Sequence, residues 1–212
     1  MKYQGIIFDL DGVICSTDKY HYLAWKQLAD RLNIYFDEII NNRLRGVSRM
    51  ESLEIVLERS EKNYSDEEKI AFASEKNDVY RQLLHQMNTS DLSEEVKSTL
   101  DALRAAGLKL AIGSSSKNTP FILERIGLGS YFDAVSDGNN IRRSKPDPEV
   151  FLKAAGMLGL SPDICMVVED AHAGVEAAVN GGFDCAVIGD AKDDERAVLH
   201  LDSFSDLLSV IA

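Results

Sequence analysis

The chain has 212 residues and a formal net charge of −12 at pH 7. This negative field repels nucleic acid and anionic membrane surfaces, and no apolar run approaches the ~18 residues of a membrane span. No signal peptide is evident, and the three cysteines lack metal-ligand spacing, which is typical of reduced thiols. We therefore predict a cytoplasmic protein that binds neither nucleic acid nor membranes, built as one large domain or as a core with an insertion.

The first apolar run, Gly5 to Phe8, is followed by the sequence Asp9-Leu10-Asp11-Gly12. In an extended chain every second side chain points to the same face, so we expect Asp9 and Asp11 to point together while Leu10 points into the core. Like charges this close repel each other unless a cation lies between them. Such a pair suits Mg²⁺, which takes carboxylate, carbonyl and water oxygens. The alternative is an acidic turn without chemistry.

The segment 16–87 is predicted to be a small all-α domain inserted after the first strand. Its first helix, over 18–32, has an apolar face that contains Trp25. Capping-box signatures that begin at Ser48 and Ser65 predict two further helices. A domain of roughly 70 residues has a marginal core, so we expect it to dock on its parent as a mobile lid.

From Ser93 onward the pattern alternates between helices and strands. Further buried strands are predicted over 108–113, 132–136, 165–168 and 185–188. This alternation implies a parallel sheet with helices on both faces. We therefore predict an α/β fold, in which a Rossmann-like, doubly wound parallel sheet forms the catalytic core (residues 1–15 and 88–212) and carries the all-α cap (residues 16–87). Ligands of such sheets bind beyond the carboxyl ends of the strands, where the strand order reverses.

Unusual polar residues collect at the carboxyl ends of the predicted strands. They are Asp9 and Asp11, Ser114, Lys145 in the loop after a strand, and Glu169 with Asp170. Because the strand ends share one edge of the sheet, we expect these side chains to surround one point. A phosphoryl group there would find Mg²⁺ and Lys145 to neutralise its oxygens, with Ser114 and N–H groups at a helix start to hold it.

In order and spacing these residues resemble the four motifs of the haloacid dehalogenase superfamily, across nearly the whole chain. The resemblance implies that Asp9 attacks phosphorus and forms an aspartyl-phosphate, while Asp11 donates and accepts the proton. A carboxylic acid two places after the nucleophile also favours phosphoester chemistry over carbon–halogen cleavage. By the same resemblance, Ser114 and Lys145 hold the phosphoryl group, and Mg²⁺ is held by Asp9, the Asp11 carbonyl and Asp170, supported by Glu169.

A second set of residues resembles the β-phosphoglucomutase family within this superfamily. It comprises Thr17, His21, Trp25, Arg45, Gly46, Arg49, Ser52 and Lys76 of the cap, with Ser116, Lys117 and Asn118 of the core. The resemblance implies that Arg49 and the residues 116–118 grip the phosphate that is not transferred. Ser52 and Lys76 would contact the sugar or its phosphate, and His21 with Thr17 would set Asp11 when the cap closes. Ser115 is a further candidate for phosphate binding.

The resemblance implies a Mg²⁺-dependent isomerase that interconverts β-D-glucose 1-phosphate and glucose 6-phosphate. The expected intermediate, and activator, is β-glucose 1,6-bisphosphate, which must bind in both orientations and so needs two phosphate sites. The expected partner is a small-molecule sugar phosphate, and the expected state is a monomer. Three alternatives are a sugar-phosphate phosphatase, which needs one phosphate site, a phospho-switch receiver module and an inactive sugar-phosphate sensor. Receiver modules are shorter and have no helical lid in the first crossover.

Several of these residues also have a plain structural interpretation when the family is set aside. His21 and Trp25 are then expected to be ordinary packing on a helix face. Lys76 is expected to be a solvated helix charge. Arg45 and Arg49 are expected to be surface charges, although the capped helix start at Ser48 favours an anion site beside Arg49.

Overall fold

The computed structural model describes residues 2–45 and 47–211. Within them lies a parallel sheet with the strand order β3-β2-β1-β4-β5-β6. The order reverses at β1, which has β2 on one side and β4 on the other, as in doubly wound folds. The strands are β1 (Gly5–Phe8), β2 (Lys109–Gly113), β3 (Ala134–Ser136), β4 (Cys165–Glu169), β5 (Asp184–Val187) and β6 (Leu199–His200).

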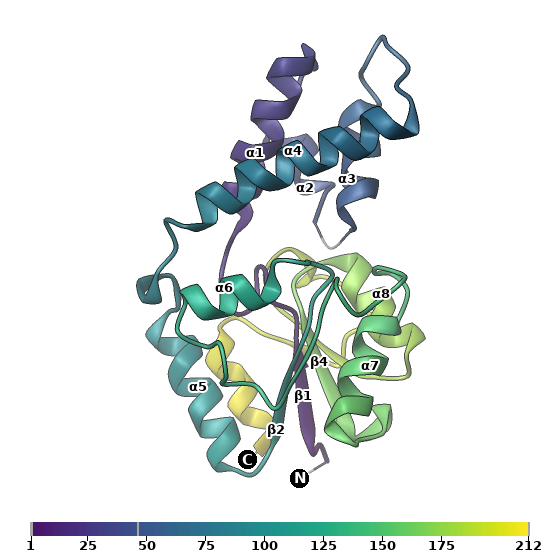
Figure 1. Ribbon diagram of the computed structural model, residues 1–212. Helices are drawn as coiled ribbons and strands as arrows, with labels where there is room; N and C mark the ends of the chain where they lie inside the picture. The colour runs from purple at the N-terminus through teal and green to yellow at the C-terminus, as the bar shows by residue number, and fades with distance from the viewer. Residues whose placement is uncertain (1, 46, 212) are drawn as a thin grey trace.

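Helices cover both faces of the sheet, which confirms the predicted α/β class (Figure 1). The side chains of β1 alternate between two hydrophobic clusters, with Ile6 and Phe8 in one and Ile7 in the other. One cluster packs against α5 (Glu94–Ala105), α6 (Thr119–Arg125) and the 3₁₀ helix η4 (Phe204–Ile211), and the other against α7 (Glu149–Leu158) and α8 (His172–Asn180).

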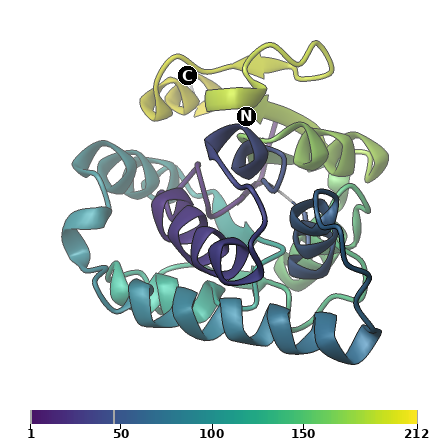
Figure 2. The same ribbon diagram turned by 90° about the horizontal axis from the view of Figure 1, so that it is seen from above.

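The inserted segment forms four helices that lie over the carboxyl ends of the strands (Figures 1 and 2). They are α1 (Asp18–Leu32), α2 (Glu38–Asn42), α3 (Arg49–Leu57) and α4 (Asp66–Leu84). Both predicted capping boxes are present. The side chains of Ser48 and Ser65 each accept a hydrogen bond from the backbone N–H of the third helical residue, a glutamate, whose carboxylate accepts from the backbone N–H of the serine. The helices bury a small cluster of their own, which includes Trp25, Phe36 and Leu53.

Cap and core are not separated by a clean apolar boundary. Tyr20 and Ala24 of α1 and Tyr80 and Leu84 of α4 belong to the larger cluster beneath them, which continues into the sheet. The chain then returns through Met87 and the 3₁₀ helix η1 (Thr89–Asp91) to α5. We propose residues 16 and 87 as the limits of the cap.

The short elements that were not predicted are α2, β6 and the 3₁₀ helices. Helix α2 and strand β6 contain five and two residues, too few to show a helix or strand period, and η4 lies in the C-terminal stretch for which no element was predicted. The 3₁₀ helices η2 (Pro162–Ile164) and η3 (Gly189–Ala191) flank β4 and β5. None of the helices in the described ranges is long and apolar enough to cross a membrane. The three cysteines are buried and free of disulfides.

The capping box of α4 yields a stability prediction. In Ser65→Ala the N–H of Glu68 loses its partner, Ser65 Oγ, at 3.3 Å. We expect a loss of about 1 kcal/mol in the free energy of unfolding, measured by denaturant titration. Ser98→Ala is the control, because Ser98 is an exposed residue inside α5 and caps no helix end. Equal stability of Ser65→Ala and wild type would contradict the prediction.

Candidate active site

A buried triad of charges joins the ends of β1 and β4. Asp9 follows β1, and its N–H donates to Val168 O at 2.9 Å, which places it beside Glu169 at the end of β4. Lys145, from the loop before α7, is 1% exposed. Its Nζ donates to Asp9 Oδ1 at 2.5 Å and also to Glu169 Oε1. The structure thus brings together three of the predicted core residues.

The acidic groups outnumber the lysine in this region. Carboxylate oxygens of Asp9, Glu169 and Asp170 lie within 4.8 Å of one another. Burial, followed by the negative charges nearby, raises the pKa of Asp170 to about 9. Burial also raises the pKa of Glu169 to about 7, although Lys145 acts in the opposite direction. A hard divalent cation would relieve this repulsion, so the three carboxylates fit Mg²⁺.

The burial of Lys145 lowers the pKa of its ammonium, but Asp9 and Glu169 outweigh that effect. The net result is a pKa above the ordinary range for lysine. Lys145 therefore carries a full positive charge at neutral pH, directly beside the candidate nucleophile.

Two glycines allow the backbone to approach these carboxylates. Gly12 has φ = 84°, and a Cβ on it would lie 1.9 Å from Asp170 Oδ2. A Cβ on Gly174, inside α8, would lie 1.9 Å from Glu169 Oε1. Gly174 was not predicted as a site residue. Its signal in the sequence is a glycine within a helix, which costs about 1 kcal/mol relative to alanine and so suggests a packing requirement.

Asp11 is held from the side of the cap. The backbone N–H and the Oγ1 of Thr17 both donate to its carboxylate, each at 2.6 Å, and Tyr80 OH donates to Thr17 Oγ1 at 3.0 Å. The carboxylate is 38% exposed, and His21 Nε2 lies 4.0 Å from Asp11 Oδ2. Burial beneath the cap, partly offset by Thr17, raises the pKa of Asp11 to about 6. A carboxyl group with this pKa can exchange protons near neutral pH.

Lys76 is not the solvated helix charge expected without the family. It is 2% exposed, and its Nζ lies 2.9 Å from His21 Nδ1. The ammonium also lies 4.7 Å from the ring centroid of Trp25 and 4.5 Å from that of Tyr80. Burial, followed by the charge of Arg49, lowers the pKa of Lys76 well below its ordinary value. Trp25 packs in the cap and also lines the pocket described below.

The two cap arginines predicted as site residues differ in their surroundings. Arg49 is the first residue of α3, behind the Ser48 cap, and burial lowers the pKa of its guanidinium. Arg45 pairs with Asp18 Oδ2 at 2.8 Å and with Asp190, which follows β5, so it links cap to core. The role predicted for Arg45 stays a prediction. Gly46, the neighbouring candidate, lies outside the described residues.

The loop after β2 has its own hydrogen-bond pattern. Ser114 Oγ accepts from Ser116 N–H at 3.2 Å, and Ser116 Oγ accepts from Asn118 N–H at 3.1 Å. Within the described part of the chain, Ser115 Oγ is buried without a hydrogen-bond partner. Asn118 Nδ2 donates to Asn77 Oδ1 of α4 at 3.0 Å, a second polar link between core and cap.

Cap and core enclose one pocket of about 770 Å³, within the usual range of small-molecule sites. Every predicted site residue that the structure describes lines it, except Thr17 and Glu169, which contact residues that do. The pocket wall also includes residues that were not predicted, among them Tyr80, Arg142 and Asp190. Tyr80 reaches the pocket through the docking of α4, whereas Arg142 and Asp190 lie in core loops after β3 and β5.

A family model described as haloacid dehalogenase-like hydrolase matches residues 3–182. The chain belongs to this family. Membership agrees with the resemblance predicted from the four motifs.

Relatives within the haloacid dehalogenase-like family include both mutases and phosphatases. β-Phosphoglucomutase of Bacillus subtilis is 39% identical over 96% of this chain and 91% of its own length. A fructose-1-phosphate phosphatase of Escherichia coli is 32% identical over 86% of this chain and 95% of its own. Among solved structures, β-phosphoglucomutase of Clostridium difficile has a TM-score of 0.91 and 37% identity, covering 97% of this chain and 93% of that one.

The close approach at Gly12 yields a testable prediction for this haloacid dehalogenase-like site. Gly12→Ala would push the Asp170 carboxylate away, so we expect Mg²⁺ affinity, measured by calorimetric titration, to fall at least ~10-fold. Gly107→Ala is a matched control, because Gly107 has φ = 90° but nothing within 4 Å of an added Cβ. Gly107→Ala therefore introduces the backbone strain of a positive φ without a steric contact. Equal Mg²⁺ affinities of the two variants would refute the steric explanation.

Proposed function

We propose that this chain is a Mg²⁺-dependent phosphomutase that interconverts β-D-glucose 1-phosphate and glucose 6-phosphate. The proposal rests on one observation, which is that a single pocket carries anion-binding groups on two walls. Lys145 and Ser114 lie on the core wall near Asp9, while Arg49 lies on the cap wall. A bisphosphate intermediate that binds in both orientations needs two such sites, whereas a phosphatase needs one. The mutases among the relatives support this choice.

In the proposed mechanism Asp9 is the nucleophile. Lys145 binds its Oδ1 and so fixes the orientation of the carboxylate. An oxygen of Asp9 forms a bond to phosphorus while the bond from phosphorus to the sugar oxygen breaks. Asp11 then donates a proton to the departing sugar oxygen. In the return step Asp11 accepts the proton of the attacking sugar hydroxyl, and the phosphoryl group leaves Asp9.

Mg²⁺ held by Asp9, the Asp11 carbonyl and Asp170, with Glu169 in support, would neutralise charge on the transferring phosphoryl group. A positioned acid–base contributes only ~10²–10⁴-fold, so Asp11 alone cannot account for phosphoryl transfer. Most of the rate must come from charge neutralisation and alignment, to which Lys145 and Ser114 contribute.

The cap residues supply the distinction between mutase and phosphatase. Arg49, with Lys117 and Asn118, would hold the phosphate that is not transferred. The cap lies over the pocket that Asp9 and Asp11 line, and closing it further over the 38% exposed Asp11 carboxylate would keep water from the aspartyl-phosphate. The alternative is a sugar-phosphate phosphatase, as the E. coli relative is named, in which water rather than a sugar hydroxyl takes the phosphoryl group.

The reaction can be assayed directly. With β-D-glucose 1-phosphate, Mg²⁺ and trace β-glucose 1,6-bisphosphate, we expect glucose 6-phosphate in a coupled dehydrogenase assay. The α anomer and the inactive variant Asp9→Asn serve as controls. Release of inorganic phosphate without glucose 6-phosphate would exclude the mutase and identify the phosphatase.

Arg49→Ala separates the two phosphate sites. We expect mutase turnover to fall by about 100-fold, because a charge-assisted contact to phosphate contributes ~1.5–3 kcal/mol, whereas hydrolysis of a small phosphate ester should persist. The matched control is Arg59→Ala, which removes a cap arginine that does not line the pocket. An equal loss of both activities in Arg49→Ala would contradict the distal role.

A further inference from the structure

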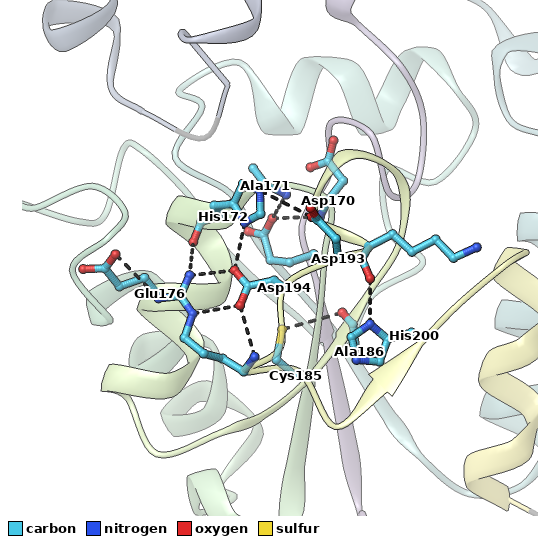
Figure 3. Close-up of polar contacts among 12 residues, drawn as sticks. Asp170, Ala171, His172, Glu176, Cys185, Ala186, Asp193, Asp194 and His200 are labelled. Carbon is cyan, nitrogen blue, oxygen red and sulfur yellow. Dashed lines mark hydrogen bonds and ion pairs between the residues drawn. The ribbon is translucent and has the colours of Figure 1, made fainter.

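A buried carboxylate outside the pocket is not used by the proposed mechanism. Asp194 lies in the segment after β5 and is 7% exposed. Its carboxylate accepts hydrogen bonds from Arg196 Nε at 2.8 Å and Arg196 Nη2 at 2.6 Å. It also contacts His172 Nδ1 at 2.8 Å, which donates in the tautomer that carries its proton there (Figure 3). Neither Asp194 nor His172 lines the pocket.

His172 connects Asp194 to the candidate metal site through the chain. His172 is the first residue of α8 and follows Glu169-Asp170-Ala171 directly. No side chain caps the start of α8 at Ala171. The Oε2 of Glu169 accepts the N–H groups of Asp170 and Ala171 at 3.0 and 3.2 Å, which holds the loop from inside.

The segment after β5 holds the same loop from outside. Ile188 N–H donates to Glu169 O, and Ala191 N–H donates to Asp170 O, both at 2.9 Å. Asp194 N–H donates to Ala191 O at 2.9 Å. Two backbone hydrogen bonds thus join this segment to Glu169 and Asp170, two of the candidate metal ligands. The contact between the Asp194 carboxylate and His172 adds a side-chain link to the same loop.

A simpler role for Asp194 would be to order its own turn through Arg196, two residues away. That role does not account for all of the contacts, because Arg196 also contacts α8. Its Nη1 lies 3.7 Å from Glu176 Oε2, and its Nη2 donates to His172 O at 3.5 Å. Asp194 and Arg196 thus both contact the first turns of α8, through His172 and Glu176.

We propose that Asp194 is a positioning residue for the metal site. Through His172, and with Arg196 as its counter-ion, it fixes the start of α8 and so the place of the Asp170 carboxylate relative to Asp9. Asp194 touches neither the substrate nor the metal. The inference rests on the proposed Mg²⁺ site and would hold for a mutase or a phosphatase.

The test measures Mg²⁺ binding by calorimetric titration of the full chain, without substrate. In Asp194→Asn we expect the dissociation constant to rise about tenfold, as when outer partners of metal ligands are lost. Glu195→Gln is the control, because it removes a carboxylate charge from the exposed residue next to Asp194, and no hydrogen bond or ion pair among the described residues joins its side chain to His172. We expect it to change the constant less than ~2-fold. Unchanged binding in Asp194→Asn, or an equal loss in both variants, would overturn the proposal.

His172→Ala is the second variant and changes no carboxylate. Its side chain is 60% exposed, so we expect it to fold even if Asp194→Asn does not. It should also weaken Mg²⁺ binding, and hydrogen exchange at the Asp170 and Ala171 amides should accelerate. Wild-type affinity and exchange in His172→Ala would refute the proposal. If wild type itself bound no Mg²⁺, the proposed metal site would fail instead.

Discussion

The geometry of the candidate active site depends on one contact, in which the ammonium of Lys145 lies between the carboxylates of Asp9 and Glu169. All three groups are almost fully buried, and removing one member of such a set leaves an uncompensated charge, at a cost of about 3–5 kcal/mol. Asp9 comes from β1, Glu169 from β4 and Lys145 from the loop before α7. The contact therefore requires the register of β1 with β4, where Phe8 pairs with Val168, and it fixes the nucleophile where the strand order reverses.

The pocket above this contact is electrostatically divided. On the core side burial raises the pKa of Glu169 and of Asp170, and the negative charge of Asp9 adds to both shifts, which favours a cation. On the cap side burial and neighbouring positive charges lower the pKa of His21 and Lys76, which favours an anion. A metal ion with a doubly phosphorylated sugar matches both halves. This division explains how a chain with a net charge of −12 could bind a strongly anionic ligand.

The sequence predicts the helix starts and the residues at the strand ends, because both depend on local patterns. The capping boxes at Ser48 and Ser65 start α3 and α4, and the convergence of Asp9 with Glu169 follows from parallel strands that end at one edge. The sequence does not predict which cap side chains become buried or reach the pocket, because that depends on how the helices pack. Lys76 is expected in solvent because its neighbours in sequence are polar, yet packing of α4 on α1 buries it against Trp25. Tyr80 of α4 enters the site for the same reason, whereas Asp190 lies in the core loop that follows β5.

Two of the polar contacts between cap and core are individually weak, which bears on the proposed reaction. Asn118 Nδ2 donates to Asn77 Oδ1, and a hydrogen bond between two neutral side chains contributes about 0.5–1.5 kcal/mol. Arg45 pairs with Asp190, whose side chain is 61% exposed, and such a pair contributes about 0–1 kcal/mol. Opening the cap must also separate apolar contacts, because Tyr20, Tyr80 and Leu84 belong to the cluster that continues into the sheet. Lid opening of this kind occurs on the microsecond to second timescale. A bisphosphate that must turn between two half-reactions requires such opening, whereas the buried Lys145 contact keeps the core site intact throughout.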